Sequence, residues 1–287
     1  MSLTFPDSKT LTVPGLTGDS SLLQLSTPAI MAVLNVTPDS FSDGGRYTDP
    51  AIAVQQGAKM VADGADILDI GGESTRPGAD PVDLKTELSR TIPVIEGLRA
   101  NGITVPVSID TMKAEVARQA VLAGANIVND VSAGTHDAEM LSTCAELGCT
   151  VVLMHMKGSP QTMQDEPNYD DFMADVSCYL AERVEAAVNA GIKPERVWID
   201  PGFGFGKLPE HNCEMIKRLS EFTELGTVLI GVSRKSTLGK ITGAEVNDRE
   251  AETLAASMLA VFNGADVIRV HEPKPLYRAL QVAKAMA

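Results

Sequence analysis

Short aliphatic runs recur along this chain, and each of them ends in polar residues. The run 29–34 ends at Asn35, and the run 67–70 leads into Gly-Gly-Glu-Ser-Thr-Arg at 71–76. Six further runs end in the same way, at Asp110, at Asn129-Asp130, at Met154-His155, at Asp200, at Ser233-Arg234-Lys235-Ser236 and at Arg269-Val270-His271. Eight short buried strands with polar residues at their carboxyl ends are typical of an α/β barrel, which collects its chemistry on that rim. The sequence therefore predicts a (β/α)8 TIM barrel.

Amphipathic segments alternate with these runs. The segments 50–63 and 170–190 carry apolar residues at helical spacing, and Gly64 and Gly191 follow them. A chain of 287 residues could form two small domains or one barrel, and a barrel typically uses about 250 residues. Composition does not change in the manner of a linker after residue 29. We therefore expect a single TIM-barrel domain over 29–287, preceded by a short N-terminal extension or hairpin over 1–28.

Composition argues against several classes of protein. The net charge of -14 leaves no basic stripe that could neutralise a nucleic-acid backbone. The chain has no apolar stretch of the roughly 18–20 residues that a membrane span needs, and no recognisable secretory signal. Its 4 cysteines lack the paired spacing of a metal site or a disulfide framework. We expect a cytoplasmic protein with free thiols that binds neither nucleic acid nor membranes.

Three motifs at the strand ends carry most of the chemical information. In 200–207, Asp-Pro-Gly-Phe-Gly-Phe-Gly-Lys, the glycines let the backbone approach a flat ligand closely. In 233–236, a serine that caps the start of a helix, next to an arginine and a lysine, predicts an anion site. Arg269 and His271 follow the last strand run, and their alternation places both side chains on the same side of the chain.

Taken in order, these segments resemble those of the dihydropteroate synthase family. The most specific matches are 35–45, 73–78, 200–207, 233–236 and 269–271, and the likeness runs from about residue 30 to the C-terminus. The resemblance implies a pterin-binding TIM barrel and a transferase of alkyl groups other than methyl. That enzyme joins 6-hydroxymethyl-7,8-dihydropterin diphosphate to 4-aminobenzoate, giving 7,8-dihydropteroate and diphosphate, with Mg²⁺ as cofactor. It also implies a homodimer formed through the last helices.

The resemblance, together with the chemistry of the ligands, assigns roles to individual residues. The expected catalytic residues are Asp110, Asp200 and Lys235. The pterin is expected to contact Asp110, Asn129, Met154, Asp200, Phe205 and Lys235. The diphosphate is expected at Asn35, Arg76, Arg269 and His271, with Asn35 also helping to hold the metal. The 4-aminobenzoate is expected at Phe41, Thr75, Pro77, Arg234 and Ser236. A carboxylate such as Asp200 suits the pterin because it accepts from the exocyclic amine and the adjacent ring N–H together.

The expected mechanism is dissociative. The bond between the pterin methylene and the diphosphate oxygen breaks first, and the resulting cation is favoured by the carboxylates of Asp110 and Asp200. The long loops 35–47 and 71–83 are expected to act as lids that exclude water from this cation. Because sulfonamides resemble 4-aminobenzoate, we also expect them to inhibit the enzyme.

Other interpretations remain open at this stage. A methyltransferase that moves a methyl group from methyltetrahydrofolate to a corrinoid would share the barrel but would not need the basic cluster. A pterin-binding protein without catalysis, or an aldolase that uses Lys235 as a Schiff base, ranks lower. Several further residues have structural interpretations: Asp69 and Asp130 as support for the rim, Trp198 as packing, and His136 and His211 as surface residues.

Overall fold

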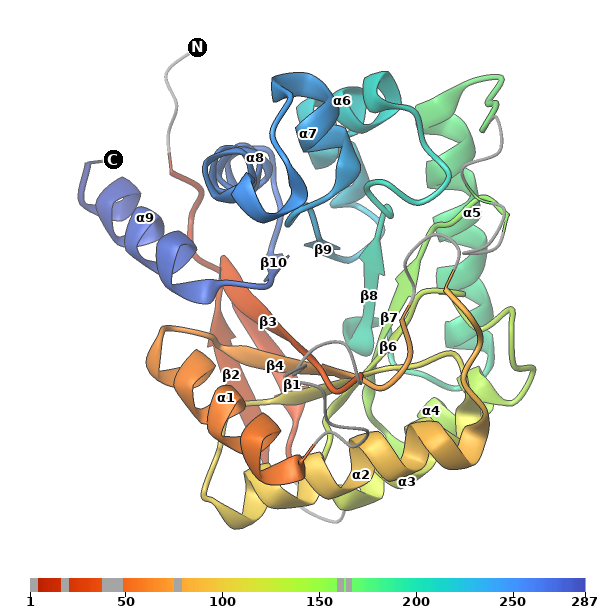
Figure 1. Cartoon of the computed structure of the whole chain (residues 1–287). Helices are drawn as coiled ribbons and strands as arrows, with labels where there is room; N and C mark the ends of the chain where they lie inside the picture. The colour runs from red at the N-terminus through yellow and green to blue at the C-terminus, as the bar shows by residue number, and fades with distance from the viewer. Residues whose placement is uncertain are drawn as a thin grey trace.

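The computed structural model describes residues 5–16, 21–37, 49–74, 79–158, 163 and 167–286. Eight parallel strands close into a barrel in the order β10-β3-β4-β5-β6-β7-β8-β9 (Figure 1). Their bounds are β3 Ala29–Asn35, β4 Ile67–Gly71, β5 Val107–Asp110, β6 Ile127–Asp130, β7 Thr150–Met154, β8 Val197–Asp200, β9 Thr227–Ile230 and β10 Val267–Val270. Each strand pairs in parallel with the next, and β10 closes on β3. The predicted fold class is therefore confirmed.

Helices surround the barrel (Figure 1). The α-helices are α1 Pro50–Ala62, α2 Leu84–Ala100, α3 Ala114–Ala123, α4 Met140–Leu147, α5 Phe172–Asn189, α6 Pro209–Lys217, α7 Ser236–Thr242, α8 Glu250–Phe262 and α9 Pro273–Met286, with short 3-10 turns at η2 Pro194–Arg196, η3 Leu219–Phe222 and η4 Val246–Asp248. Helix α5 begins two residues later than predicted because Asp171 caps it, accepting from the backbone N–H of Ala174. Among the described residues, none of the helices is long and apolar enough to cross a membrane.

The strands are buried on both faces. Every residue of β4 to β8 is buried, as expected of a parallel sheet covered by helices outside and filled by side chains inside. Two apolar clusters lie between the strands and the helices, and a third lies among strand residues near the amino ends, where Met31, Trp198 and Val267 meet. The interpretation of Trp198 as a packing residue agrees with its 1% exposure.

A two-stranded antiparallel sheet packs against this third cluster. It consists of β1 Thr10–Pro14 and β2 Leu22–Ser26. Val13 and Leu25 are buried among the barrel residues of the cluster, and the side-chain amide of Asn126 donates to the carbonyl of Pro14 at 3.0 Å. These contacts close the amino-terminal end of the barrel and leave its carboxyl-terminal end for the site.

Candidate active site

The predicted pterin residues gather at the carboxyl ends of neighbouring strands. Asp110 ends β5 and lies in register with Asn129 of β6, and Met154 ends β7 in register with Asp200 of β8. All four are buried. Because parallel strands end on the same rim, these side chains share the mouth of the barrel.

Arg269 on β10 crosses this mouth to two carboxylates. Its Nε donates to Asp69 Oδ2 and its Nη2 to Asp110 Oδ2, each at 2.7 Å. Asp69 is fully buried and also accepts from Asn129 Nδ2 at 3.3 Å. Asp69 therefore supports the rim, as the sequence predicts. It orients Arg269, which is predicted to bind the diphosphate, and Asn129, which is predicted to bind the pterin. Two of the three strands involved, β4 and β10, are labelled in Figure 1.

Burial changes the proton affinities of the ionisable groups in the mouth. It raises the pKa of Asp110 to about 7, with the Arg269 guanidinium opposing the shift and the Asp69 carboxylate adding to it. It raises the pKa of Asp200, against the opposing charge of Lys235. It lowers the pKa of Lys235 to about 8, again opposed by Asp200. Although burial also disfavours the charge of Arg269, the carboxylates of Asp69 and Asp110 raise its pKa overall. Two of these groups thus titrate close to neutrality.

The glycine-rich loop after β8 brings Asp200, Phe205 and Lys235 together. Asp200 Oδ1 accepts from the backbone N–H of Gly202 at 2.7 Å. Lys235 Nζ lies 4.4 Å from the centre of the Phe205 ring and donates to the Phe203 carbonyl. These contacts place an acceptor, an aromatic ring and a cation side by side.

Lys207 is a buried residue of this loop that the sequence analysis did not assign. Its Nζ lies 2.8 Å from His155 Nδ1 and 2.9 Å from the Phe205 carbonyl oxygen, and its side chain is buried. Burial lowers the pKa of Lys207 and lowers that of His155 to about 2. The position of Lys207 at the end of a glycine-rich motif was the available signal, but its orientation toward His155 follows only from the fold.

The start of α7 differs from the prediction in one respect. Lys235 occupies the cap position without a side-chain cap, and Ser236 is the first helical residue, so Ser236 does not cap the helix. The strand before it ends at Ile230, which leaves 233–236 on the loop and first turn. This correction follows from the extended backbone of Lys235, whose side chain turns to the β8 loop.

Arg234 points toward the end of the last strand. It has a positive φ of 59°, and its Nη2 lies 3.2 Å from Glu272 Oε1. Arg234 also lines a cavity of about 70 Å³ together with Thr253 and Glu272. Of the predicted site residues that the structure describes, only Arg234 lines this cavity. Next to it, His271 Nδ1 lies 2.9 Å from Ser233 Oγ.

Asn35 ends β3 beside Asp110. A methyl group placed on Gly71 would lie 3.3 Å from Asn35 Oδ1 and 3.9 Å from Asp110 Oδ2, so the two oxygens flank the same glycine. Among the described residues, no group of three His, Cys, Asp or Glu side chains could hold a metal ion. Mg²⁺ needs only one or two protein oxygens when phosphate oxygens complete its shell. The donor set therefore fits a Mg²⁺ shared with a diphosphate.

Four predicted site residues, Phe41, Thr75, Arg76 and Pro77, lie outside the described residues, as do parts of both predicted lid loops.

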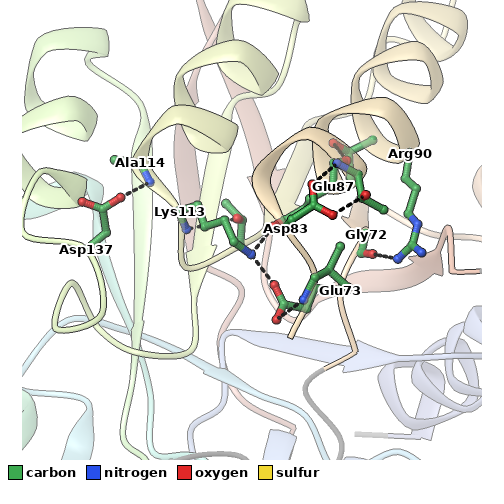
Figure 2. A network of polar contacts seen from close by, with 12 residues as sticks. Gly72, Glu73, Asp83, Glu87, Arg90, Lys113, Ala114 and Asp137 are labelled. Atoms are coloured by element: carbon green, nitrogen blue, oxygen red, sulfur yellow. Dashed lines mark hydrogen bonds and ion pairs between the residues drawn. The ribbon is translucent and has the colours of Figure 1, made fainter. Parts of the chain in front are cut away.

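A partly buried ionic network supports the residues on either side of β5. Figure 2 shows Lys113 between two carboxylates, Glu73 and Glu87. Lys113 Nζ lies 2.6 Å from Glu87 Oε2, and Glu87 is fully buried. Glu73 follows β4 and Lys113 precedes α3, while Arg90 donates to the carbonyl of Gly72 at 2.8 Å. The network joins the loop after β4 to the segment that follows Asp110.

Comparisons with known proteins show the family of the chain. A family model described as pterin binding enzyme matches residues 31–271. The dihydropteroate synthase of Escherichia coli (strain K12) is 44% identical over 264 residues, which cover 92% of this chain and 93% of that protein. These matches span nearly all of the barrel.

Solved structures give the same result. The dihydropteroate synthase of Xanthomonas albilineans with 4-aminobenzoic acid is 46% identical, with a TM-score of 0.88 over 96% of this chain and 98% of that one. The enzyme of Yersinia pestis in a sulfonamide drug complex is 40% identical, with a TM-score of 0.89 over 97% and 99% of the two chains. The methyltransferase alternative is not favoured. The chain belongs to the pterin-binding enzymes and, within them, to the dihydropteroate synthase family.

Proposed function

We propose that the chain carries out the dihydropteroate synthase reaction at this rim by a dissociative mechanism. The C–O bond between the pterin methylene and the diphosphate breaks, and its electron pair leaves with the diphosphate. The amine nitrogen of 4-aminobenzoate then forms the C–N bond and loses a proton. The observation that carries the proposal is the mouth of the barrel, where the carboxylates of Asp110 and Asp200 lie with the cations of Arg269 and Lys235.

The pterin has complementary partners in the mouth. Asp200 would accept from the exocyclic amine and the ring N–H, and Asn129 offers both a donor and an acceptor beside it. Lys235 would donate to the pterin carbonyl. Met154 and Phe205 would contact the ring faces, since both lie next to these polar groups.

The diphosphate would lie toward β3 and β10. Arg269 and His271 would supply cationic or donor groups there. The proposal also assigns Arg76 to the diphosphate, although this residue is not among the described ones. Mg²⁺, when bound, would neutralise charge on the diphosphate oxygens. Asn35 Oδ1 would hold the ion, and its position beside Asp110 Oδ2 supports this assignment.

For 4-aminobenzoate, the proposal assigns the carboxylate to the start of α7, with Ser236 and Arg234 nearby. Phe41, Thr75 and Pro77 would complete the pocket. The relative from Yersinia pestis in its sulfonamide complex supports the further proposal that sulfonamides compete with 4-aminobenzoate here. Competitive inhibition kinetics against 4-aminobenzoate would test it.

We also propose a cytoplasmic homodimer. Ile241 and Leu259, on α7 and α8, expose large apolar side chains, as do Tyr277 and Val282 on α9. Such side chains on adjacent helices are what a second copy would cover. The four cysteines are free thiols, in keeping with a reducing compartment.

The mechanism is tested with a substrate carrying a heavy-oxygen label at the bridge between methylene and phosphorus. Without 4-aminobenzoate, reversible C–O cleavage moves label into the non-bridging phosphate positions of recovered substrate. Label that stays in the bridge in an enzyme competent for turnover contradicts the dissociative step. In parallel, Asp200→Asn and Lys235→Ala are expected to raise the KM for the pterin substrate.

A further inference from the structure

The buried side-chain amide of Asn212 connects the loop after β8 to the first turn of α7. Asn212 lies on α6, was not among the predicted residues, and is fully buried. Its Oδ1 accepts from the backbone N–H of Gly204 at 2.7 Å. Its Nδ2 donates to Thr237 Oγ1 at 2.9 Å and to the Leu208 carbonyl at 3.0 Å. The side chain thus uses its acceptor and both donor hydrogens.

The acceptor end of this amide fixes the pterin side. Gly204 lies between Phe203 and Phe205 in the loop that follows Asp200. A methyl group on Gly204 would lie 3.0 Å from Lys235 Cδ, so Lys235 passes directly over this residue.

The donor end fixes the side assigned to 4-aminobenzoate. Thr237 is buried and is the second residue of α7, directly after Ser236. Its hydroxyl therefore ties the first turn of α7 to Asn212, and through Asn212 to Gly204.

We propose that Asn212 is a positioning residue that sets the distance between the β8 loop and the start of α7. The inference rests on the proposed function, because these two segments would hold the two substrates. The reacting carbon belongs to one substrate and the attacking nitrogen to the other, so a small displacement between the segments costs reaction rate more than it costs the binding of either substrate. A side chain that touches neither substrate thereby acts on the bond-forming step.

Thr237 provides the cleanest test because two of its variants differ mainly in the hydroxyl. Thr237→Val removes the acceptor for Asn212 Nδ2 with little change of shape, whereas Thr237→Ser keeps it. The measurements are kcat, the KM for 4-aminobenzoate, and the Kd for 6-hydroxymethyl-7,8-dihydropterin diphosphate alone, determined by calorimetry. Thermal unfolding of each variant is recorded alongside.

The proposal expects Thr237→Val to lose about tenfold or more in kcat/KM for 4-aminobenzoate, with the pterin Kd changed less than about twofold. Thr237→Ser should stay within about twofold of the wild type in every quantity. In a double-mutant cycle, Asn212→Ala together with Thr237→Val should lose less than the product of the two single losses, because both remove one interaction.

Wild-type kinetics in Thr237→Val would overturn the positioning role. Equal losses in pterin binding and in turnover, together with a lower unfolding midpoint, would also overturn it, since they indicate general damage. An inactive wild-type chain would count against the proposed function itself, so the two failures are distinguishable. The Thr237 variants decide the question even if Asn212→Ala does not fold.

Discussion

Asp110 and Lys235 have pKa values that burial brings toward each other from opposite sides. The carboxyl of Asp110 is raised to about 7 and the amine of Lys235 is lowered to about 8. Asp110 acts on a developing cation only when it is ionised, and Lys235 donates best when it is charged. The two requirements are met together only in a narrow range of pH.

The pH profile of kcat/KM should therefore be bell-shaped. Activity should rise near pH 7 as Asp110 loses its proton and fall near pH 8 as Lys235 loses its own. Asp69→Asn removes a neighbouring negative charge that raises the pKa of Asp110, so its ascending limb should move to lower pH. An ascending limb that stays in place in this variant would show that Asp110 does not control it.

Gly202 and Gly102 make a matched pair for testing the β8 loop. Both have positive φ, 72° and 76°. A methyl group on Gly202 would collide with the carbonyl oxygen of His155, whereas one on Gly102 would meet no atom within 4 Å. Gly102→Ala should cost about 1–2 kcal/mol of unfolding free energy from its backbone alone and leave catalysis unchanged.

Gly202→Ala should cost more stability than Gly102→Ala and should also raise the KM for the pterin substrate, because the displaced loop carries the N–H that orients Asp200. Denaturant unfolding and steady-state kinetics of both variants check this. Equal behaviour of the two variants would contradict the close approach at Gly202.

At the scale of elements, ion pairs join the segments that follow β4 and β5. Lys113 binds Glu73 from the β4 loop and Glu87 from α2 (Figure 2). Lys113 binds Glu87 Oε2, and the buried Oε1 of the same carboxylate has no hydrogen-bond partner among the described residues. A buried carboxylate left without its cation is strongly destabilising.

Lys113→Met should therefore lower the free energy of unfolding by up to about 3 kcal/mol. This is the lower end of the range for breaking a buried ion pair, because Lys113 is partly exposed and solvent screens its charge. Adding Glu87→Gln should restore part of the loss, because it removes the unpaired charge. Lys59→Met, which breaks the exposed pair with Asp63, serves as the control and should have little effect. Urea unfolding provides the measurement, and a Lys113→Met chain as stable as the control would contradict this account.

The sequence predicts strands, helices and the rim well because these follow from local periodicity. Asp110, Asn129 and Asp200 could be found from their places at the ends of aliphatic runs. The pairing of these rim residues with one another could not be predicted, because the partners lie far apart in the chain; Arg269 and Asp69, for example, are 200 positions apart. Asn212 gives no sequence signal of its role, because an asparagine on a helix is usually exposed, and only the fold brings Gly204 and Thr237 to its two sides.

At the scale of the whole molecule, the β1–β2 sheet and the proposed site lie at opposite ends of the barrel. The β1–β2 sheet packs at the amino ends of the strands, and the polar cluster lies at the carboxyl ends. Substitutions in the sheet should therefore change stability without changing catalysis.

Leu25 and Leu22, both on β2, provide the comparison. Leu25 is 8% exposed and packs in the third apolar cluster, at the amino ends of the strands, whereas Leu22 is 54% exposed. Leu25→Ala should cost about 2–3 kcal/mol of unfolding free energy, and Leu22→Ala much less, with both KM values at the wild-type level. A change in KM in Leu25→Ala would indicate that the two ends of the barrel are coupled.

The most direct test of the central claim is the stoichiometry of the reaction. The purified chain is incubated with 6-hydroxymethyl-7,8-dihydropterin diphosphate and 4-aminobenzoate, with and without Mg²⁺, and both products are quantified over time. Diphosphate and 7,8-dihydropteroate should appear one to one, more slowly without Mg²⁺, and Asp200→Asn should lose most of this turnover. Pterin binding without turnover, or diphosphate release without 7,8-dihydropteroate, would contradict the account.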